Sequence, residues 1–172
     1  GIRSVEVHRA TLFDNRPRRV DVDVLESARP DQLWYQGDSL SDAVVLRITG
    51  PRGSAIVTLS DGSGTEAIAN AVNRSMRSTG VSAAVESTDL QRLRFASERF
   101  GSSQSITVET LLGQFEVVDT NDVPVNHDQG ADASVRINGR LAETDGLAAR
   151  IQNRNLSLDL SLDERAVPGE RS

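Results

Sequence analysis

The residues that could do chemistry in this chain are few. Its two histidines, His8 and His127, lie far apart in the sequence, and the chain has no cysteine. Without cysteine there is no thiolate nucleophile, no disulfide and no cysteine ligand for zinc, so a zinc site would have to be built on two distant histidines. We therefore predict no zinc site, and we expect His8 to lie on the polar face of a strand.

A candidate nucleophile is Ser39, within the motif Gly37-Asp38-Ser39-Leu40-Ser41. This motif resembles the GDSL signature of a family of serine hydrolases. A serine nucleophile needs a histidine base that is itself oriented by a carboxylate, and that family takes both from a late D-x-x-H motif. In this chain Pro124, not aspartate, stands three residues before His127. We therefore interpret residues 37–41 as a turn and predict that the chain is not an enzyme.

An acidic loop could suggest calcium. Asp119-Thr120-Asn121-Asp122 is followed by Asp128, but the loop lacks the central glycine and the terminal bidentate glutamate of an EF-hand. We interpret residues 119–130 as a solvated loop. Together these observations predict no catalytic residue, no cofactor-binding residue and no metal ligand in the chain.

Two aromatic residues, Trp34 and Tyr35, stand together in a segment that is rich in turn-forming residues. They could form a platform for a sugar or a protein, but we expect a buried anchor, because the chain has few other aromatic side chains. Asn73-Arg74-Ser75 and Asn155-Leu156-Ser157 match the N-glycosylation sequon. We interpret both as chance matches, since one lies in an expected helix and the other in an expected strand.

Composition excludes some classes of partner. The chain has 172 residues, 37% of them hydrophobic and 3% aromatic, and a formal net charge of −6. An acidic chain does not neutralise phosphates, so we predict no nucleic-acid partner. No apolar run approaches the roughly 20 residues that a transmembrane helix needs, so we predict no membrane insertion.

One segment, residues 63–78, is expected to be an amphipathic helix. Ser63 and Glu66 have the spacing of a capping box, and Gly80 follows the last apolar residue as a stop signal. The apolar residues at four-residue steps are Ile68, Val72 and Met76. Because such a stripe must be buried, we expect the helix to pack on the face of a sheet.

Most of the remaining chain alternates apolar and polar residues, which is typical of half-buried antiparallel strands. The alternating segments are Val5–Val7, Val20–Val24, Val44–Ile48, Ala55–Leu59, Val81–Val85, Leu93–Phe95, Ile106–Val108, Ala133–Ile137, Leu147–Ile151 and Leu156–Leu162. Many short strands with one helix predict an α+β fold that is mostly antiparallel sheet. We expect residues 1–172 to form one outer domain with two lobes, one of residues 43–118 and one of residues 1–42 plus 130–163, followed by a disordered tail at 164–172.

The order of several short motifs resembles a known family. Gly130-Ala131-Asp132-Ala133, Val135-Arg136-Ile137-Asn138-Gly139 and Gly146-Leu147, followed by alternating leucines, resemble the flagellin hook IN motif. Upstream, Leu46-Arg47-Ile48-Thr49-Gly50 and Ile68-Ala69-Asn70-Ala71-Val72-Asn73 are similar to outer-domain flagellin sequence. The resemblance covers roughly residues 44–163, and it rests on order and spacing more than on any single motif.

The resemblance implies a surface-exposed, non-catalytic outer domain of a bacterial flagellin, secreted and assembled into the extracellular filament that serves motility. It implies that other flagellin subunits bind through segments outside this chain, that a flagellar export chaperone is a further partner, and that the isolated domain is a monomer. The long heptad helices of flagellins are missing here. The chain is therefore either the central insert of a flagellin or the corresponding domain of a filament-cap or hook-associated protein.

Two rival functions stay open at this point. The first is an adhesin or carbohydrate-binding module that uses Trp34, Tyr35 and the loop at 119–130. The second is the hydrolase built on Ser39. The sequence also leaves open the sites of any glycosylation and the surface partners.

Overall fold

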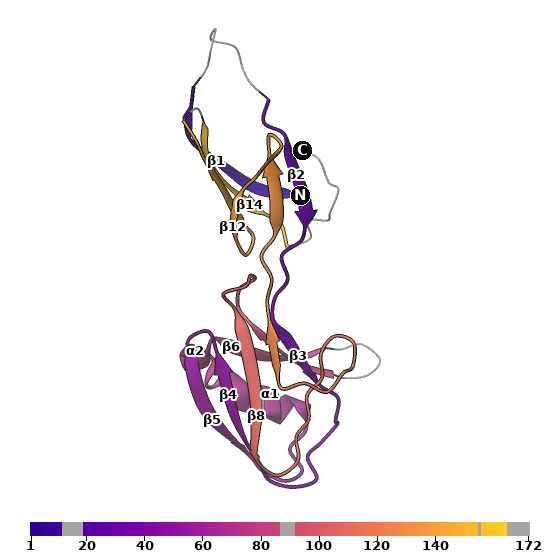
Figure 1. The fold of residues 1–172 in the computed structure, drawn as a ribbon. Helices are drawn as coiled ribbons and strands as arrows, with labels where there is room; N and C mark the ends of the chain where they lie inside the picture. The colour runs from indigo at the N-terminus through magenta and orange to yellow at the C-terminus, as the bar shows by residue number, and fades with distance from the viewer. Residues whose placement is uncertain (12–18, 87–91, 155, 165–172) are drawn as a thin grey trace. The chain divides into compact units, whose positions relative to one another are not determined.

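The structure, a computed structural model, describes residues 1–11, 19–86, 92–154 and 156–164. The chain divides into two compact units. Unit 1 contains Gly1–Arg29, Phe100–Ser102 and Ala131–Ser172, and unit 2 contains Pro30–Arg99 and Ser103–Gly130. Figure 1 shows the strands and helices of each unit. The prediction of a mainly antiparallel fold is confirmed, since every strand pair in the described residues is antiparallel.

Unit 1 is built from two sheets. The four-stranded sheet has the order β1-β14-β13-β12, and its strands are β1 (Ile2–Ala10), β14 (Leu156–Leu162), β13 (Ala148–Gln152) and β12 (Glu143–Asp145). The three-stranded sheet has the order β11-β10-β2, and its strands are β11 (Arg140–Leu141), β10 (Ser134–Ile137) and β2 (Val22–Glu26).

The core of unit 1 follows from strict alternation along β14. Leu158, Leu160 and Leu162 are at most 3% exposed, whereas Asp159 between them points away from the core. The buried partners on the other strands are mainly β-branched: Val22, Val24, Val135, Ile137 and Ile151. Burying each of these side chains stabilises the fold by about 1.5–3 kcal/mol.

The hairpin from β10 to β11 turns at Asn138-Gly139, as the sequence predicts. Both residues have positive φ, 51° at Asn138 and 76° at Gly139. A two-residue turn with positive φ at both positions matches the twist of the strands that it joins, and asparagine and glycine adopt it most readily. The Asn138 side chain also accepts a hydrogen bond from the N–H of Asp21, at 3.0 Å.

Unit 2 also contains two sheets, and two helices join them. The four-stranded sheet β5-β4-β8-β9 consists of β5 (Gly53–Leu59), β4 (Val44–Gly50), β8 (Ser105–Leu112) and β9 (His127–Gln129). The three-stranded sheet β3-β7-β6 consists of β3 (Gln32–Tyr35), β7 (Arg92–Ser97) and β6 (Val81–Glu86). The helices are α1 (Thr65–Asn73) and α2 (Met76–Thr79). Side chains of both sheets and of α1 form one apolar cluster.

The prediction of one helix over residues 63–78 is wrong. α1 ends at Asn73, and α2 begins at Met76. Ser75 between them has φ −96° and ψ 0°, and its hydroxyl donates to the carbonyl of Val72 at 2.7 Å. Such local side-chain bonds compete with helical backbone bonds and interrupt helices.

The predicted capping box is also absent. Gly64, not Ser63, is the N-cap residue of α1, and no side chain caps the helix. At the other end the Asn73 amide binds β6 instead of solvent: it donates to the carbonyl of Ala83 and accepts from the N–H of Ala83, both at 2.8 Å. Ile68 and Val72 are fully buried as expected, but Met76 is only partly buried.

Residues 30–42, which we grouped with residues 130–163, belong to unit 2. Within them, β3 pairs with β7, with Leu33 opposite Phe95. The strand escaped the sequence analysis because it has only four residues and lies among turn formers. β9 lies inside the segment 119–130 that we expected to be loop. The tail expected at 164–172 lies outside the described residues, except for Glu164.

None of the helices in the described residues has the length and apolar character that a membrane span requires.

Candidate functional site

Ser39, the candidate nucleophile, lies in a connection that leads past the start of α1. It forms an isolated bridge with Gly64. The next residue, Leu40, is buried, and its N–H donates to the carbonyl of Ser63 at 3.0 Å. These contacts give residues 37–41 a structural role, holding the β3–β4 connection against the N-terminus of α1.

Each of the two histidines contacts a side chain of its own sheet. His127 lies on β9, where its Nδ1 is 3.0 Å from the hydroxyl oxygen of Thr107 on β8. His8 lies on β1 in the other unit of the chain. In the part of the chain that the structure describes, no hydrogen bond joins Ser39 to a histidine, so the nucleophile–base pair of a hydrolase is not formed there.

The carboxylates of the acidic loop accept hydrogen bonds from the loop itself and from residues outside it. Asp119 accepts hydrogen bonds from the N–H groups of Val123, at 3.0 Å, and Asn121, at 2.7 Å, and these bonds hold its pKa below the usual value. Asp122 accepts from Gln36, at 2.7 Å, and pairs with Arg92. Across the described residues, no group of three or more histidine, cysteine, aspartate or glutamate side chains is arranged to hold a metal ion.

The two neighbouring aromatic residues have different roles. Tyr35 is 9% exposed and stacks on Phe115, with the ring centroids 4.3 Å apart and the planes 7° from parallel. Burial raises the pKa of Tyr35. Trp34 is only half-buried, and the guanidinium of Arg92 lies 5.5 Å from its ring centroid. Tyr35 is thus the anchor of this segment, whereas Trp34 forms part of the surface.

An open groove of about 640 Å³ lies beside the stacked rings. Tyr35 and Phe115 contribute to its wall together with the polar side chains of Gln36, Gln114 and Glu116.

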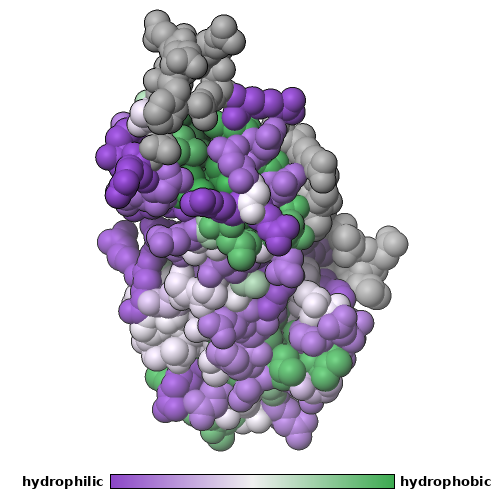
Figure 2. Space-filling view, turned by 45° about the horizontal axis from the view of Figure 1, so that its top comes forward, coloured by the Kyte–Doolittle hydropathy of each residue, from purple (hydrophilic) through white to green (hydrophobic). Residues whose placement is uncertain are grey.

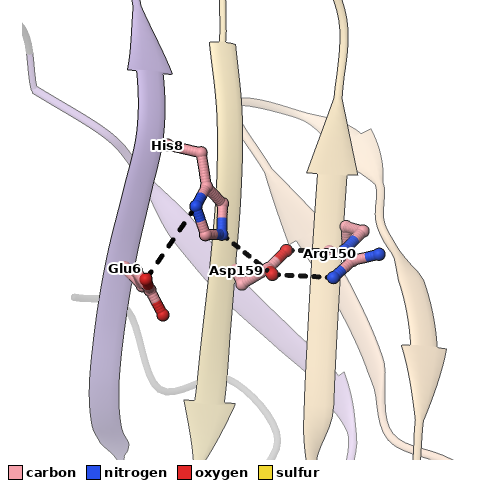
Figure 3. Close-up of polar contacts among 4 residues, drawn as sticks. All are labelled: Glu6, His8, Arg150 and Asp159. Atoms are coloured by element: carbon pink, nitrogen blue, oxygen red, sulfur yellow. Dashed lines mark hydrogen bonds and ion pairs between the residues drawn. The ribbon is translucent and has the colours of Figure 1, made fainter.

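A ladder of charges crosses the outer face of the four-stranded sheet of unit 1 (Figure 3). Asp159 on β14 accepts two hydrogen bonds from Arg150 on β13, at 2.7 and 2.8 Å, and its other neighbour is His8 on β1, at 3.0 Å. The bonds from Arg150 and then His8 lower the pKa of Asp159 to about 2. Glu6 stands 3.9 Å from the same histidine. Because these side chains are exposed, the ladder contributes little to stability.

Asp132, within the G-x-D-A segment, has its donors on distant parts of the chain. Its Oδ1 accepts from the N–H groups of Ser102, at 2.9 Å, and Gly146, at 2.7 Å, and its Oδ2 accepts from the Ser102 hydroxyl at 2.5 Å. Partial burial by itself raises the pKa of Asp132, but the hydrogen bonds outweigh it and hold the pKa below its usual value. Asp132 thereby binds Phe100–Ser102 to unit 1.

Two glycines allow this close approach. A Cβ at Gly101 would lie 2.6 Å from Oδ1 of Asp132, and a Cβ at Gly146 would lie 2.5 Å from the carbonyl oxygen of Phe100. Gly146 also has a φ of 58°, which side chains rarely adopt. The sequence analysis placed Gly146 in the motif, but nothing in the spacing indicated that it meets Gly101.

The sequence analysis missed a second aspartate of this kind, Asp31 in unit 2. Its side chain is fully buried, and its Oδ1 accepts from the N–H of Ser97, at 3.1 Å, and from the Ser97 hydroxyl. Oδ2 is buried and has no hydrogen-bond partner among the described residues. Burial raises the pKa of Asp31 against these hydrogen bonds. A single aspartate between a proline and a glutamine carries no sequence signal that could have indicated this role.

A comparison with known families finds a match, which covers part of the chain. Residues 45–98 match the family described as the flagellin hook IN motif. The resemblance is confirmed, but the matched residues are those of the upstream segment and not 130–163, where we placed the motif. No curated protein is detectably similar to the chain in sequence.

Solved structures of flagellar cap proteins share the fold over nearly the whole chain. FliD from Bdellovibrio bacteriovorus has 15% identity and a TM-score of 0.61, and the match covers 97% of this chain and 93% of that one. The D2–D3 domains of FliD from Serratia marcescens have 18% identity and a TM-score of 0.64, with 98% and 96% covered. Those from Escherichia coli have 17% identity and a TM-score of 0.60, with 98% and 95% covered.

At such identities the structural likeness shows the fold, and the family match supplies the link to the flagellum. The chain therefore contains a flagellin hook IN motif within a fold shared with flagellar cap proteins, and the prediction of a flagellar component is confirmed.

Proposed function

We propose that the chain is the outer part of a flagellar cap protein, a structural and non-catalytic component at the end of the filament. The observation that carries the proposal is the coverage: solved chains of cap proteins match both units of this chain and leave little of either partner unmatched. The sequence alone favoured a filament subunit and kept the cap protein as the alternative. The fold instead favours the cap protein over the filament subunit.

The polar residues of the chain support a structural role. Asp132 binds a segment to its own unit, Asp119 closes a turn, and Asp159 joins three strands. Each of these carboxylates accepts hydrogen bonds from donors of the same unit, and those of Asp132 and Asp119 come from backbone N–H groups that they hold in place. The hydrolase reading of Ser39 gains no support from this arrangement.

Assembly is proposed to run mainly through segments outside this chain. The resemblance to flagellins implies assembly through long helical segments, whereas α1 has nine residues. We propose that such segments of the parent protein bind other flagellar subunits, that an export chaperone binds the parent before secretion, and that the chain itself is displayed outside the cell.

The copy number of the chain in purified flagella distinguishes a cap protein from a filament subunit. Flagella would be purified from the bacterium that carries this chain, and peptides of the chain would be counted against peptides of the major filament protein by quantitative mass spectrometry. A cap occupies one end of a long filament, so we expect the chain to be a small minority of the subunits. A count equal to that of the major filament protein would mean that the chain is a filament subunit.

A binding module is the second candidate, and the groove beside Tyr35 and Phe115 favours it. Aromatic rings next to amide side chains suit the apolar faces and hydroxyls of a sugar. Binding on a glycan array that is lost in Phe115→Ala, with the fold retained, would support this function beside the structural one. Trp34 does not line the groove, so Trp34→Ala is the comparison and should leave such binding unchanged. Binding that survives Phe115→Ala would place the contact elsewhere.

A further inference from the structure

Open edges of sheets are sites where another strand can pair, and natural proteins protect them with charges or cover. The four sheets of the described residues have eight edge strands. Five of them carry charged side chains, which are Arg3, Glu6 and Arg9 on β1, Asp23 and Glu26 on β2, Asp128 on β9, Arg140 on β11, and Glu143 and Asp145 on β12.

Two further edge strands are covered. On β3, the N–H of Trp34 donates to Val118, at 2.9 Å, and the N–H of Gln32 donates to Asp128, at 2.8 Å. On β6, the Asn73 amide takes both the N–H and the carbonyl of Ala83, as a neighbouring strand would. These contacts use the backbone groups that a second chain would need.

The remaining edge strand, β5, has neither protection. Its sequence, Gly-Ser-Ala-Ile-Val-Thr-Leu, contains no charge and no proline and is rich in β-branched residues. Within the described residues, the hydrogen bonds that hold β5 come from β4. In an antiparallel pair every second residue directs its N–H and C=O away from its neighbour, so a row of these groups on β5 faces outward.

The outer face of β5 is also apolar at its centre. Val57 and Leu59 are buried, whereas Ile56 is 56% exposed. On the face shown in Figure 2, hydrophobic surface occurs as separate patches among hydrophilic residues. The other large exposed apolar side chains of the described residues are Val5, Val7, Leu25, Leu111, Leu112, Val123 and Leu141. Ile56 is the one that stands in the middle of an uncharged edge strand.

We propose that β5 is a docking edge for β5 of a second copy of this chain, paired antiparallel and centred on Ile56. In such a twofold arrangement Ile56 lies opposite its own copy, and Ser54 lies opposite Thr58. The two sheets of four strands would then continue as one, and each Ile56 would be covered by the other.

The absence of charge is what makes a second copy the fitting partner. In a twofold antiparallel pairing a charge at the central residue meets its own copy, and a charge away from the centre meets the residue at the mirror position. Centring β1 on Glu6 would do this. β5 brings no like charges together. One pair of strands buries less surface than a stable interface, so the pairing is weak and becomes populated when copies are held at high local concentration.

This pairing does not depend on the function proposed above, because a filament subunit or an adhesin could use the same edge. It also agrees with a chain that is a monomer in dilute solution.

The test is sedimentation equilibrium of the 172-residue chain from about 10 μM to about 1 mM, a range that spans weak self-association. We expect the weight-average mass to rise from 18.6 kDa toward twice that value. Ile56→Glu should weaken the association at least about tenfold, because two carboxylates would then meet at the centre. Ile56→Glu should keep its fold, since Arg47 lies directly opposite on β4.

Two further samples make the test specific to this edge. Val5→Glu, at an apolar residue that is 53% exposed on another edge strand, should leave the association unchanged. A mixture of Ile56→Glu with Ile56→Arg should associate again, because opposite charges would meet across the axis. A wild-type chain that stays at its monomer mass, an equal effect of Val5→Glu, or a mixture that fails to associate would each overturn the proposal.

Discussion

Asp132 in unit 1 and Asp31 in unit 2 are held in similar ways and have opposite pKa shifts. Each accepts hydrogen bonds from the backbone and the hydroxyl of one serine, Ser102 or Ser97. Asp132 uses both oxygens and also accepts from Gly146, and its pKa is lowered. Asp31 is fully buried with one oxygen unpaired, and its pKa is raised.

The difference indicates that one additional hydrogen-bond donor and partial exposure to water determine whether the pKa of a structural carboxylate is lowered or raised. A buried charge without its full set of donors costs free energy, whereas a fully bonded carboxylate at the surface of a unit stabilises the segments that it joins. Asp132 is therefore expected to be a net stabiliser of unit 1, and Asp31 to specify the position of Ser97 in unit 2 at some cost.

The largest expected effect comes from filling the space beside Asp132. Gly146→Ala would place a Cβ 2.5 Å from the carbonyl oxygen of Phe100, at a φ of 58°. We expect a loss of about 3 kcal/mol or more in the free energy of unfolding, measured with urea. Gly139→Ala is the matched control, since its φ is 76° but no atom lies within 4 Å of the added Cβ. It should cost about 1 kcal/mol, and equal losses would show that backbone strain alone, not the contact, makes Gly146 necessary.

Removing the Asp132 carboxylate comes next. Asp132→Ala leaves the N–H groups of Ser102 and Gly146 without acceptors, so we expect unit 1 to lose about 2 kcal/mol. Hydrogen exchange should accelerate at the amides of Ser102 and Gly146 and not in unit 2. Unchanged exchange at these two amides would mean that Phe100–Ser102 is held by other contacts.

The same conservative substitution should change the stability in opposite directions at the two aspartates. Asp132→Asn keeps only one carbonyl acceptor and should cost about 1 kcal/mol. Asp31→Asn removes a buried charge and keeps an acceptor for Ser97, so stability at neutral pH should stay the same or rise by about 1 kcal/mol. Urea unfolding of both variants checks the signs. A clear destabilisation by Asp31→Asn would show that its charge is stabilising.

Acid should change the contributions of the two aspartates to stability in opposite directions. Because the folded-state pKa of Asp132 is below the usual value of 3.8, its contribution to stability is present above that value and is lost as the pH falls through the folded pKa. The folded-state pKa of Asp31 is raised, so stability is lost as the pH rises from 3.8 through the folded pKa. Carboxyl-carbon NMR titrations should give the lower midpoint for Asp132. The reverse order would contradict the comparison.

The smallest effect is expected at the exposed ladder of unit 1. Arg150→Ala removes the two hydrogen bonds that contribute most to the low pKa of Asp159, so this pKa should rise from about 2 toward 3.8. The thermal midpoint should barely move, because exposed ion pairs contribute little. A large fall in the midpoint would show that the ladder is a structural element and not only a surface feature.

The sequence predicted the sheets better than the helix or the polar contacts. Alternation along Leu156–Leu162 marked the buried face of β14, because burial of every second residue is visible in a single strand. The helix prediction failed at Asn73 and Ser75, where side chains bind Ala83 and Val72 and compete with the helix. Helical periodicity does not register such tertiary contacts.

Contacts between residues that are far apart in the sequence explain the other differences between the predictions and the structure. Asp132 was part of a recognised motif, but its partner Ser102 stands 30 positions away and has no distinctive neighbour. β3 and β9 are short strands whose pairing depends on β7 and β8, so local alternation over three or four residues did not reveal them. The association of both strands with unit 2 likewise follows from partners elsewhere in the chain.

The most direct test of the proposed function is the position of the chain on intact flagella. Antibodies raised against residues 1–172 would be applied to flagella and located by immunogold electron microscopy, with a strain that lacks this coding region as the control. The account predicts gold at the distal end of the filament and none in the control. Gold distributed along the whole filament would contradict it and identify the chain as part of a filament subunit.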